Sequence, residues 1–243
     1  VVSSLSSGDT AGAVDLVDVK TPVLHVWQNP TDKSWNVTNL FKKQSPDQPM
    51  ALRSNILIHD GTFRVAPAQG KTAVVEKVNG SVSLADYPSV RGDATASVDG
   101  QDVSLSVHYM SARDYDIRVK GSGLSANFAA SYVPGDTGVS LTEGGVGEYF
   151  LHIRESHDGL FVEGQADLNH LGFVYGDYRV SDVTGQIRLF DTDLYLNDVY
   201  AKVNDQAVAI SGLVKINGNV PVFDLKVDAD RVDMGALTVG RDV

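Results

Sequence analysis

The chain of 243 residues contains no cysteine. This absence excludes disulfides, Cys-ligated zinc, iron–sulfur clusters and thiol catalysis. Basic residues are also scarce, because 20 Lys and Arg stand against 31 Asp and Glu, for a formal net charge of −11. Binding to nucleic acid or to an anionic membrane surface depends on clustered Lys and Arg. We therefore expect no nucleic-acid partner and no electrostatic docking on a membrane.

Long apolar segments are missing as well. No run approaches the roughly 20 apolar residues that span a bilayer. The opening residues, VVSSLSSGDT, lack the charged and apolar regions of a signal peptide. We expect the sequence to be part of a longer protein whose membrane anchor lies upstream of Val1.

Catalytic and metal-binding motifs are absent too. His152 and His157 are the closest pair among six histidines, and no H-E-x-x-H motif surrounds them. G-x-S-x-G and G-x-x-x-x-G-K-[ST] do not occur. Asp191, Asp193 and Asp198 do not fit the spacing of a calcium loop. We expect no enzyme, no cofactor and no metal site.

A two-residue hydrophobic period dominates what is present. In 103–109, 115–119 and 223–227, apolar residues alternate with polar ones, which is typical of strands with one apolar and one polar face. Turn signals recur between the alternating segments, which predicts an antiparallel meander of hairpins. The expected turns are HDG (59–61), VNG (78–80), VDG (98–100), HDG (157–159), VND (203–205) and NGN (217–219).

One segment has helical character. In SWNVTNLFKK (34–43), Asn36 is a candidate N-cap, and apolar residues follow at helical spacing before two lysines. The sequence thus predicts an all-β protein with one short helix, over 36–43, near the N-terminus.

Part of the chain is duplicated. Residues 78–106 align without a gap to residues 183–211, and ten of the 29 positions are identical, including Gly80 with Gly185 and Asp93 with Asp198. We therefore expect N-terminal strands and the helix in 1–70, a first meander in 71–132, and a connection with a second meander in 133–243. The Gly-rich stretch 133–149 is expected to be a long loop or a weak pair of strands.

Two meanders in line would give one continuous apolar face, and a curled sheet would enclose that face as a groove. The residues expected to line the groove are the apolar members of the alternating strands. They are Leu84, Val103, Leu105, Tyr115, Ile117, Leu189, Val208, Ile210, Phe223 and Leu225.

The N-terminal stretch AVDLVDVKTPVLHVWQNPTDKSWNVTNLF (13–41) resembles the opening of the periplasmic part of AsmA-like proteins, including the TamB-like members. The resemblance lies in a strand with a proline, an apolar strand, a turn, and a Trp-Asn pair before a short helix. The parts are Val17, Val19, Pro22, Val23, Leu24, Val26, Trp35, Asn36 and Leu40. SNILIHDGTFRV (54–65) and the meander from 78 onward are similar to the elements that follow.

This resemblance implies an elongated, curled antiparallel sheet, the β-taco, with an apolar groove. It further implies a bridge-like lipid-transfer protein in the periplasm of a diderm bacterium, anchored in the inner membrane. The implied partners are phospholipid and an outer-membrane barrel protein of the TamA/BamA type.

Two other functions stay open. The chain could be a scaffold for assembly and secretion of outer-membrane proteins that pairs a sheet edge with a client strand. It could also be a carbohydrate-acting or adhesive β-repeat protein. That class would normally have clustered exposed aromatics and paired carboxylates, and neither is evident in the sequence.

Overall fold

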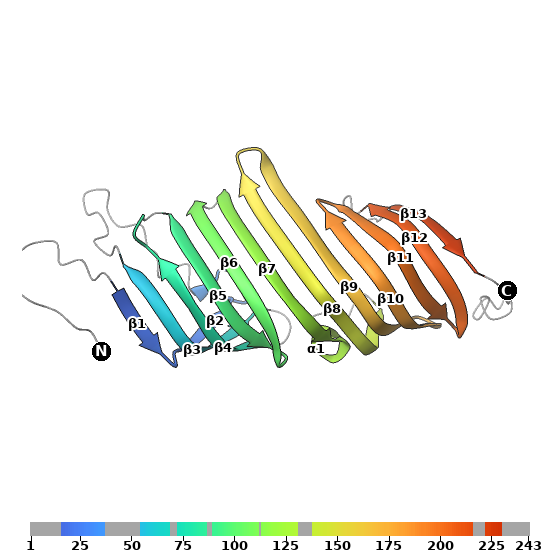
Figure 1. Ribbon diagram of the computed structural model, residues 1–243, viewed down its shortest axis with the longest axis horizontal. Coiled ribbons are helices and arrows are strands. Elements are labelled where there is room, and N and C mark those ends of the chain that lie inside the picture. The colour runs from blue at the N-terminus through green and yellow to red at the C-terminus, as the bar shows by residue number, and fades with distance from the viewer. Residues whose placement is uncertain are drawn as a thin grey trace, which may run out of the picture. The chain divides into compact units, whose positions relative to one another are not determined.

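The computed structural model in Figure 1 describes residues 16–36, 54–68, 72–86, 89–111, 113–130, 138–215 and 222–229. These residues form an all-β structure, as the alternation predicts, with one short helix among them, α1 (Ala126–Ala130). The strands are β1 (Leu16–Lys20), β2 (Val23–Trp27), β3 (Asn55–Ala66), β4 (Ala73–Ser83), β5 (Val90–Val98), β6 (Gln101–Ser111), β7 (Asp114–Ser125), β8 (Val139–Ser156), β9 (Gly159–Tyr175), β10 (Tyr178–Phe190), β11 (Asp193–Val203), β12 (Gln206–Lys215) and β13 (Val222–Asp228).

The chain divides into two compact units. Unit 1 comprises the residues up to Val119 together with Arg154–Gly159, and unit 2 comprises Lys120–Ile153 and the residues from Leu160 onward. In unit 1, strands β3 to β6 pair in sequence order as antiparallel neighbours, and β1 and β2 both pair with β3 in parallel. In unit 2, strands β9 to β13 also pair in sequence order, and every pair is antiparallel. Each unit is therefore a sheet built mostly from consecutive strands.

A row of β-bulges crosses each unit. In unit 1, Thr21 between β1 and β2, Asp60 in β3 and Lys77 in β4 have φ values of 49°, 52° and 51°. The strand register shifts on both sides of the Gly61–Val78 pair, so the bulges of β3 and β4 are neighbours. The Asn79 amide links them, because its Oδ1 accepts from the Asp60 N–H at 3.0 Å and its Nδ2 donates to the Lys77 carbonyl at 2.8 Å.

Unit 2 repeats this arrangement on three neighbouring strands. His170 in β9, Asp182 in β10 and Asp198 in β11 have φ values of 49°, 56° and 48°. The register shifts at these positions, between Val180 and Val183 and between Leu196 and Val199.

Each bulge places two consecutive polar residues on the same face of the sheet, while the flanking residues, three positions apart, share the other face. Bulges bend the strand that carries them. Because the additional residue is on the polar face, the apolar face lies on the inner side of the bend. The pairs are His59–Asp60, Glu76–Lys77, Asn169–His170, Ser181–Asp182 and Asn197–Asp198.

Two of the expected turns are tight hairpins at equivalent positions of the repeat. Asp99–Gly100 joins β5 to β6 and Asn204–Asp205 joins β11 to β12, and all four residues have a positive φ. This is the type I′ pattern that suits the twist of two antiparallel strands. The hairpin turns expected at 98–100 and 203–205 are confirmed, and 157–159 contains the turn between β8 and β9.

The turns expected at HDG (59–61) and VNG (78–80) are wrong. Both segments lie inside strands, β3 and β4. Residues that accept a positive φ serve a bulge as well as a turn, so this local signal does not tell the two apart. The turn expected at 217–219 lies outside the described residues.

The described helix was not expected where it lies. In α1 the Ser125 hydroxyl accepts from the Phe128 N–H at 3.1 Å, as an N-cap does. The helix expected over 36–43 lies outside the described residues beyond Asn36. The Asn36 side chain bonds the edge of β2, with Oδ1 accepting from the Trp27 N–H and Nδ2 donating to the His25 carbonyl, both at 2.9 Å.

The expectation for the Gly-rich stretch 133–149 also needs correction. Its described part from Val139 belongs to β8, an unbroken strand of 18 residues, and not to a loop or to a pair of weak strands. In unit 2 this strand is a close neighbour of β7, because a Cβ on Gly145 would lie 2.2 Å from the Leu124 carbonyl oxygen. Glycine suits such close backbone contact between strands.

Candidate functional site

One face of each unit is apolar and mostly open. Among the described residues, just seven hydrophobic side chains are buried, and several large ones on this face are exposed, among them Leu105, Phe223 and Val227. The strands contact mainly their neighbours within the sheet. The described part of the chain therefore provides no second layer of structure over this face. A sheet normally covers its apolar face with another layer. The open face is therefore the candidate functional site, and it is described separately for each unit.

The apolar face of unit 1 contains a hollow of about 250 Å³. Its walls are apolar side chains from four strands, and its floor is made by residues with little or no side chain, Gly80, Gly92 and Ala94. The strand register places these residues on one face, since Ile58 pairs with Gly80, Gly80 with Ala94 and Ala94 with Leu105. The wall residues are Ile58, Phe63, Val78, Val82, Val90, Leu105 and Val107.

Gly80 is required by the packing at this floor. A Cβ at that position would lie 2.4 Å from the Asp93 carbonyl oxygen and 2.7 Å from the Ala94 Cβ. Its counterpart in the repeat, Gly185, meets the Asp198 carbonyl oxygen at 2.5 Å. The identical Gly and Asp pairs of the duplicated sequence therefore mark the same close approach of two strands.

The apolar face of unit 2 is built from rows of side chains that run across the strands. Val183, Val199 and Ala201 are buried at its centre. Around them pack half-buried side chains from β9 to β12: Leu168, Leu171, Phe173, Val180, Ile187, Leu196, Val208 and Ile210. Toward β13 the face opens, and Phe223 and Leu225 are 63% and 37% exposed.

The residues expected to line the groove fall on these faces as follows. Leu84 and Leu105 belong to the face of unit 1, where Leu84 is buried and Leu105 is 40% exposed, and Val103 shares that face because it pairs with Ala96. In unit 2 the register brings the expected residues onto one face through the cross-strand pairs Leu189–Leu194, Leu194–Val214, Val214–Phe223, Gly212–Leu225, Val199–Ile210 and Ala201–Val208.

Tyr115 and Ile117 are half-buried and share one face of β7. The Tyr115 hydroxyl donates to the Glu155 carboxylate, and this hydrogen bond raises the pKa of Tyr115. Tyr115 therefore has a polar contact in addition to its half-buried side chain.

Sequence reasoning missed the central residues of both faces. Val78, Val183, Val199, Leu168 and Leu171 were not expected to line the groove. They flank the bulges, where apolar residues lie three positions apart and break the two-residue period. The sequence signal that could have identified two of them is that Val78 and Val183 occupy the same position of the repeat and are the same residue type.

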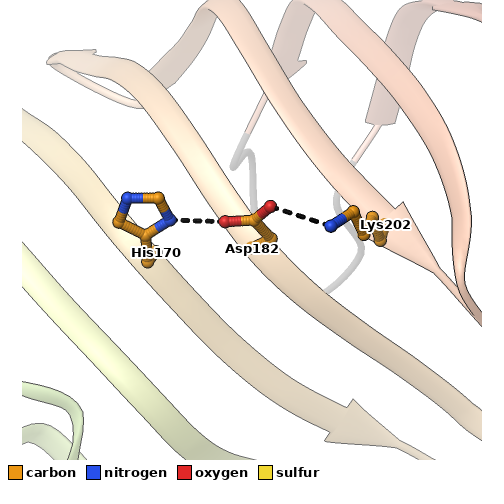
Figure 2. A network of polar contacts seen from close by, with 3 residues as sticks. All are labelled: His170, Asp182 and Lys202. Carbon is orange, nitrogen blue, oxygen red and sulfur yellow. Dashed lines mark hydrogen bonds and ion pairs between the residues drawn. The ribbon is translucent and has the colours of Figure 1, made fainter.

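The opposite, polar face of unit 2 carries a network across three strands, drawn in Figure 2. One Asp182 carboxylate oxygen pairs with His170 Nδ1, and the other lies 3.1 Å from Lys202 Nζ. The hydrogen bond with His170, followed by the contacts with Lys202, lowers the pKa of Asp182. Since His170 and Asp182 are bulge residues, the network connects neighbouring bulges on the polar face.

Two kinds of feature are absent from the described residues. They contain no group of three or more His, Asp or Glu side chains that could hold a metal ion. Of their helices, none has the length and apolar character needed to cross a membrane.

In comparisons with family models, with curated proteins and with solved structures, nothing matches this chain.

Proposed function

We propose that this chain is part of a lipid-transfer protein that holds phospholipid acyl chains against its apolar face. The observation that carries the proposal is the open apolar face of each unit, with the hollow of unit 1 at Gly80 and the exposed rows of unit 2 toward β13. Large exposed apolar surfaces mark interaction sites. Acyl chains are suitable occupants because they need no specific polar partner, and the walls of the hollow are apolar.

The energetics suit transport rather than tight capture. Each methylene group removed from water stabilises the bound chain by about 0.8 kcal/mol. Similar apolar rows repeat from strand to strand, so an acyl chain could move along them without a chemical step. Together with the resemblance of 13–41 to AsmA-like proteins, this favours phospholipid transfer across a periplasm. An inner-membrane anchor upstream and an outer-membrane barrel of the TamA/BamA type belong to the same proposal.

The alternative, a scaffold for the assembly of outer-membrane proteins, requires an edge strand that is open to pairing. β13 is the last strand in the described order, and its polar face carries Asp224, Lys226 and Asp228. Lys226 Nζ lies 2.8 Å from an Asp228 carboxylate oxygen. Charged side chains are a usual means of protecting edge strands from pairing. The edge therefore favours the lipid function over strand pairing.

The test is native mass spectrometry and lipid extraction of the chain purified from a bacterial membrane lysate without detergent. We expect bound phospholipid in the wild type and less in Leu105→Asp, because an unpaired charge opposes acyl chains in the hollow. Val74→Asp is the matched control. Val74 is also 40% exposed, but it pairs with Arg64 on the opposite face of β4. Equal lipid content in both variants, or a wild type that carries no lipid, would contradict the proposal.

A further inference from the structure

The polar face of unit 2 contains a depression of about 550 Å³ lined by residues of β8, β9, β10 and β11. Aromatic rings of Phe150, Phe190 and Tyr195 line it. Phe190 and Tyr195 are 50% and 38% exposed. This volume lies in the range of pockets that hold small ligands. The cluster of aromatics, which the sequence did not reveal, is assembled from strands β8, β10 and β11.

The strand register places polar groups between the aromatic rings. Gln165 pairs with Arg188, and Arg188 pairs with Tyr195 on the next strand. Glu163 pairs with Phe190 in the same way. Since neighbouring strands are about 4.8 Å apart, these side chains form a compact patch three strands wide.

Contacts within the patch hold several of these groups in place. Phe190 packs edge-to-face on Phe161 with ring centroids 5.2 Å apart. Arg188 Nε donates to Gln186 Oε1 at 2.9 Å, and Gln186 Nε2 donates to Asp167 Oδ1 at 3.0 Å. The patch is thus preorganised, which lowers the entropic cost of binding.

Hydrogen-bonding capacity remains in the patch. Within the described residues, the side chains of Glu163, Gln165 and Asn197 form no hydrogen bond or ion pair, although Glu163 and Gln165 are half-buried. They offer a carboxylate acceptor and two amides that both donate and accept. One carboxylate and one guanidinium line the depression, so their charges balance and favour an uncharged ligand.

We propose that this depression binds a neutral oligosaccharide. A sugar ring has an apolar C–H face that fits an aromatic ring, and its rim of hydroxyls both donates and accepts hydrogen bonds. A stable protein partner would bury about 800 Å² on each side, typically with a hydrophobic centre, whereas here charged and amide groups alternate with the rings in a small concave site. The binding site is on the polar face and does not depend on the proposed lipid function.

Isothermal titration calorimetry of the full chain with tetra-N-acetylchitotetraose, cellotetraose and maltotetraose tests the proposal. We expect binding of at least one of these, and about three- to tenfold weaker binding by Tyr195→Ala, from the usual contribution of an aromatic contact. Tyr200→Ala is the matched control, because Tyr200 is exposed on the same face of β11 and does not line this depression. Its affinity should equal that of the wild type.

Glu163→Gln provides a second variant that keeps the side-chain volume. We expect at least about threefold weaker binding, because hydrogen bonds to a charged acceptor are stronger than neutral ones. Thermal unfolding establishes that each variant is folded. Absence of binding to all three saccharides overturns the proposal, as do equal affinities of Tyr195→Ala and Tyr200→Ala. Binding of an unfolded peptide at this depression in place of saccharide would also overturn it.

Discussion

Lys77 and Asp182 lie 105 positions apart, and each has a positive φ, of 51° and 56°, at a bulge of its strand. Neither residue is a glycine, so the backbone conformation is locally unfavourable at both positions. The strand pairs on either side maintain it, because the register shifts in the same way around Val78 and Val183. The duplication therefore includes a backbone irregularity as well as an alternating pattern of side chains.

Alanine at Gly80 or Gly185 should destabilise the fold. The new Cβ would lie within 2.5 Å of an aspartate carbonyl oxygen in both cases, so the strands must move apart. We expect a loss of about 1–3 kcal/mol in the free energy of unfolding, measured by urea denaturation. Gly92→Ala is the control, because its Cβ would meet the Ser81 carbonyl oxygen at 3.4 Å. A loss at Gly92 as large as at Gly80 would contradict this account of the close approach.

The two tight hairpins allow a reciprocal exchange. Asp205 and Gly100 occupy the same position of the repeat, with φ values of 66° and 76°. Asp205→Gly should stabilise the protein by about 0.5–1 kcal/mol, and Gly100→Asp should destabilise it by a similar amount, because glycine adopts a positive φ without a steric penalty. Thermal unfolding of both variants measures this. Shifts of the same sign in the two variants would contradict the equivalence of the turns.

The strands could be predicted from sequence where the two-residue period is regular, as in 103–109. The tight turns could be predicted where Asp or Asn precedes the second strand of a hairpin. The strands that contain a bulge could not be predicted in this way. In GQADLNHLGFVY (164–175), Leu168 and Leu171 share a face although they are three positions apart, because His170 adds a residue to the strand. A pair of polar residues between two apolar ones is the signature of such a bulge. It resembles a turn signal, which explains why 59–61 and 78–80 were misread.

The candidate site was predictable only in part, for a related reason. Residues such as Leu189, Ile210 and Leu225 alternate regularly and could be placed on one face. The aromatic cluster on the polar face depends on the register between β9, β10 and β11, which the sequence of one strand does not encode. Phe161 lies near the start of β9 and Phe190 ends β10, so most of both strands and the turn between them separate the two residues along the chain. Their contact follows from the register of the two strands.

Aspartate on the apolar face should have different effects at the centre and near β13. Val183 is buried in the central cluster, so Val183→Asp should lower the free energy of unfolding by more than about 3 kcal/mol. Leu225 is 37% exposed, so its new carboxylate would stay hydrated, and Leu225→Asp should cost less than about 1 kcal/mol. Urea denaturation distinguishes the two. Equal, large losses would mean that the face near β13 is covered in solution.

The Asp182 network should make a small, pH-dependent contribution to stability. Its hydrogen bonds with His170 and Lys202 lower the pKa of the folded-state carboxyl below the ordinary value of 3.8. A carboxyl with a depressed folded-state pKa stabilises the fold fully above its unfolded-state pKa. That contribution is lost as the pH falls through the folded-state pKa.

NMR titration of the Asp182 carboxyl measures this directly. Its midpoint should lie below 3.8 in the wild type and rise toward that value in Lys202→Met or His170→Gln. Lys202→Arg keeps the charge and should keep the midpoint low. A midpoint that does not respond to either neighbour would contradict the network of Figure 2.

The bulges also suggest how such a sheet could grow during evolution. Since they lie side by side on neighbouring strands, a hairpin copied together with its bulges brings matching irregularities to the edge that it joins. The meander of β10, β11 and β12 relates to that of β4, β5 and β6 in this manner, with Asp198 as an additional bulge that β5 lacks. Gene duplication in units of hairpins would therefore lengthen the apolar face and leave the arrangement of its side chains across each strand unchanged.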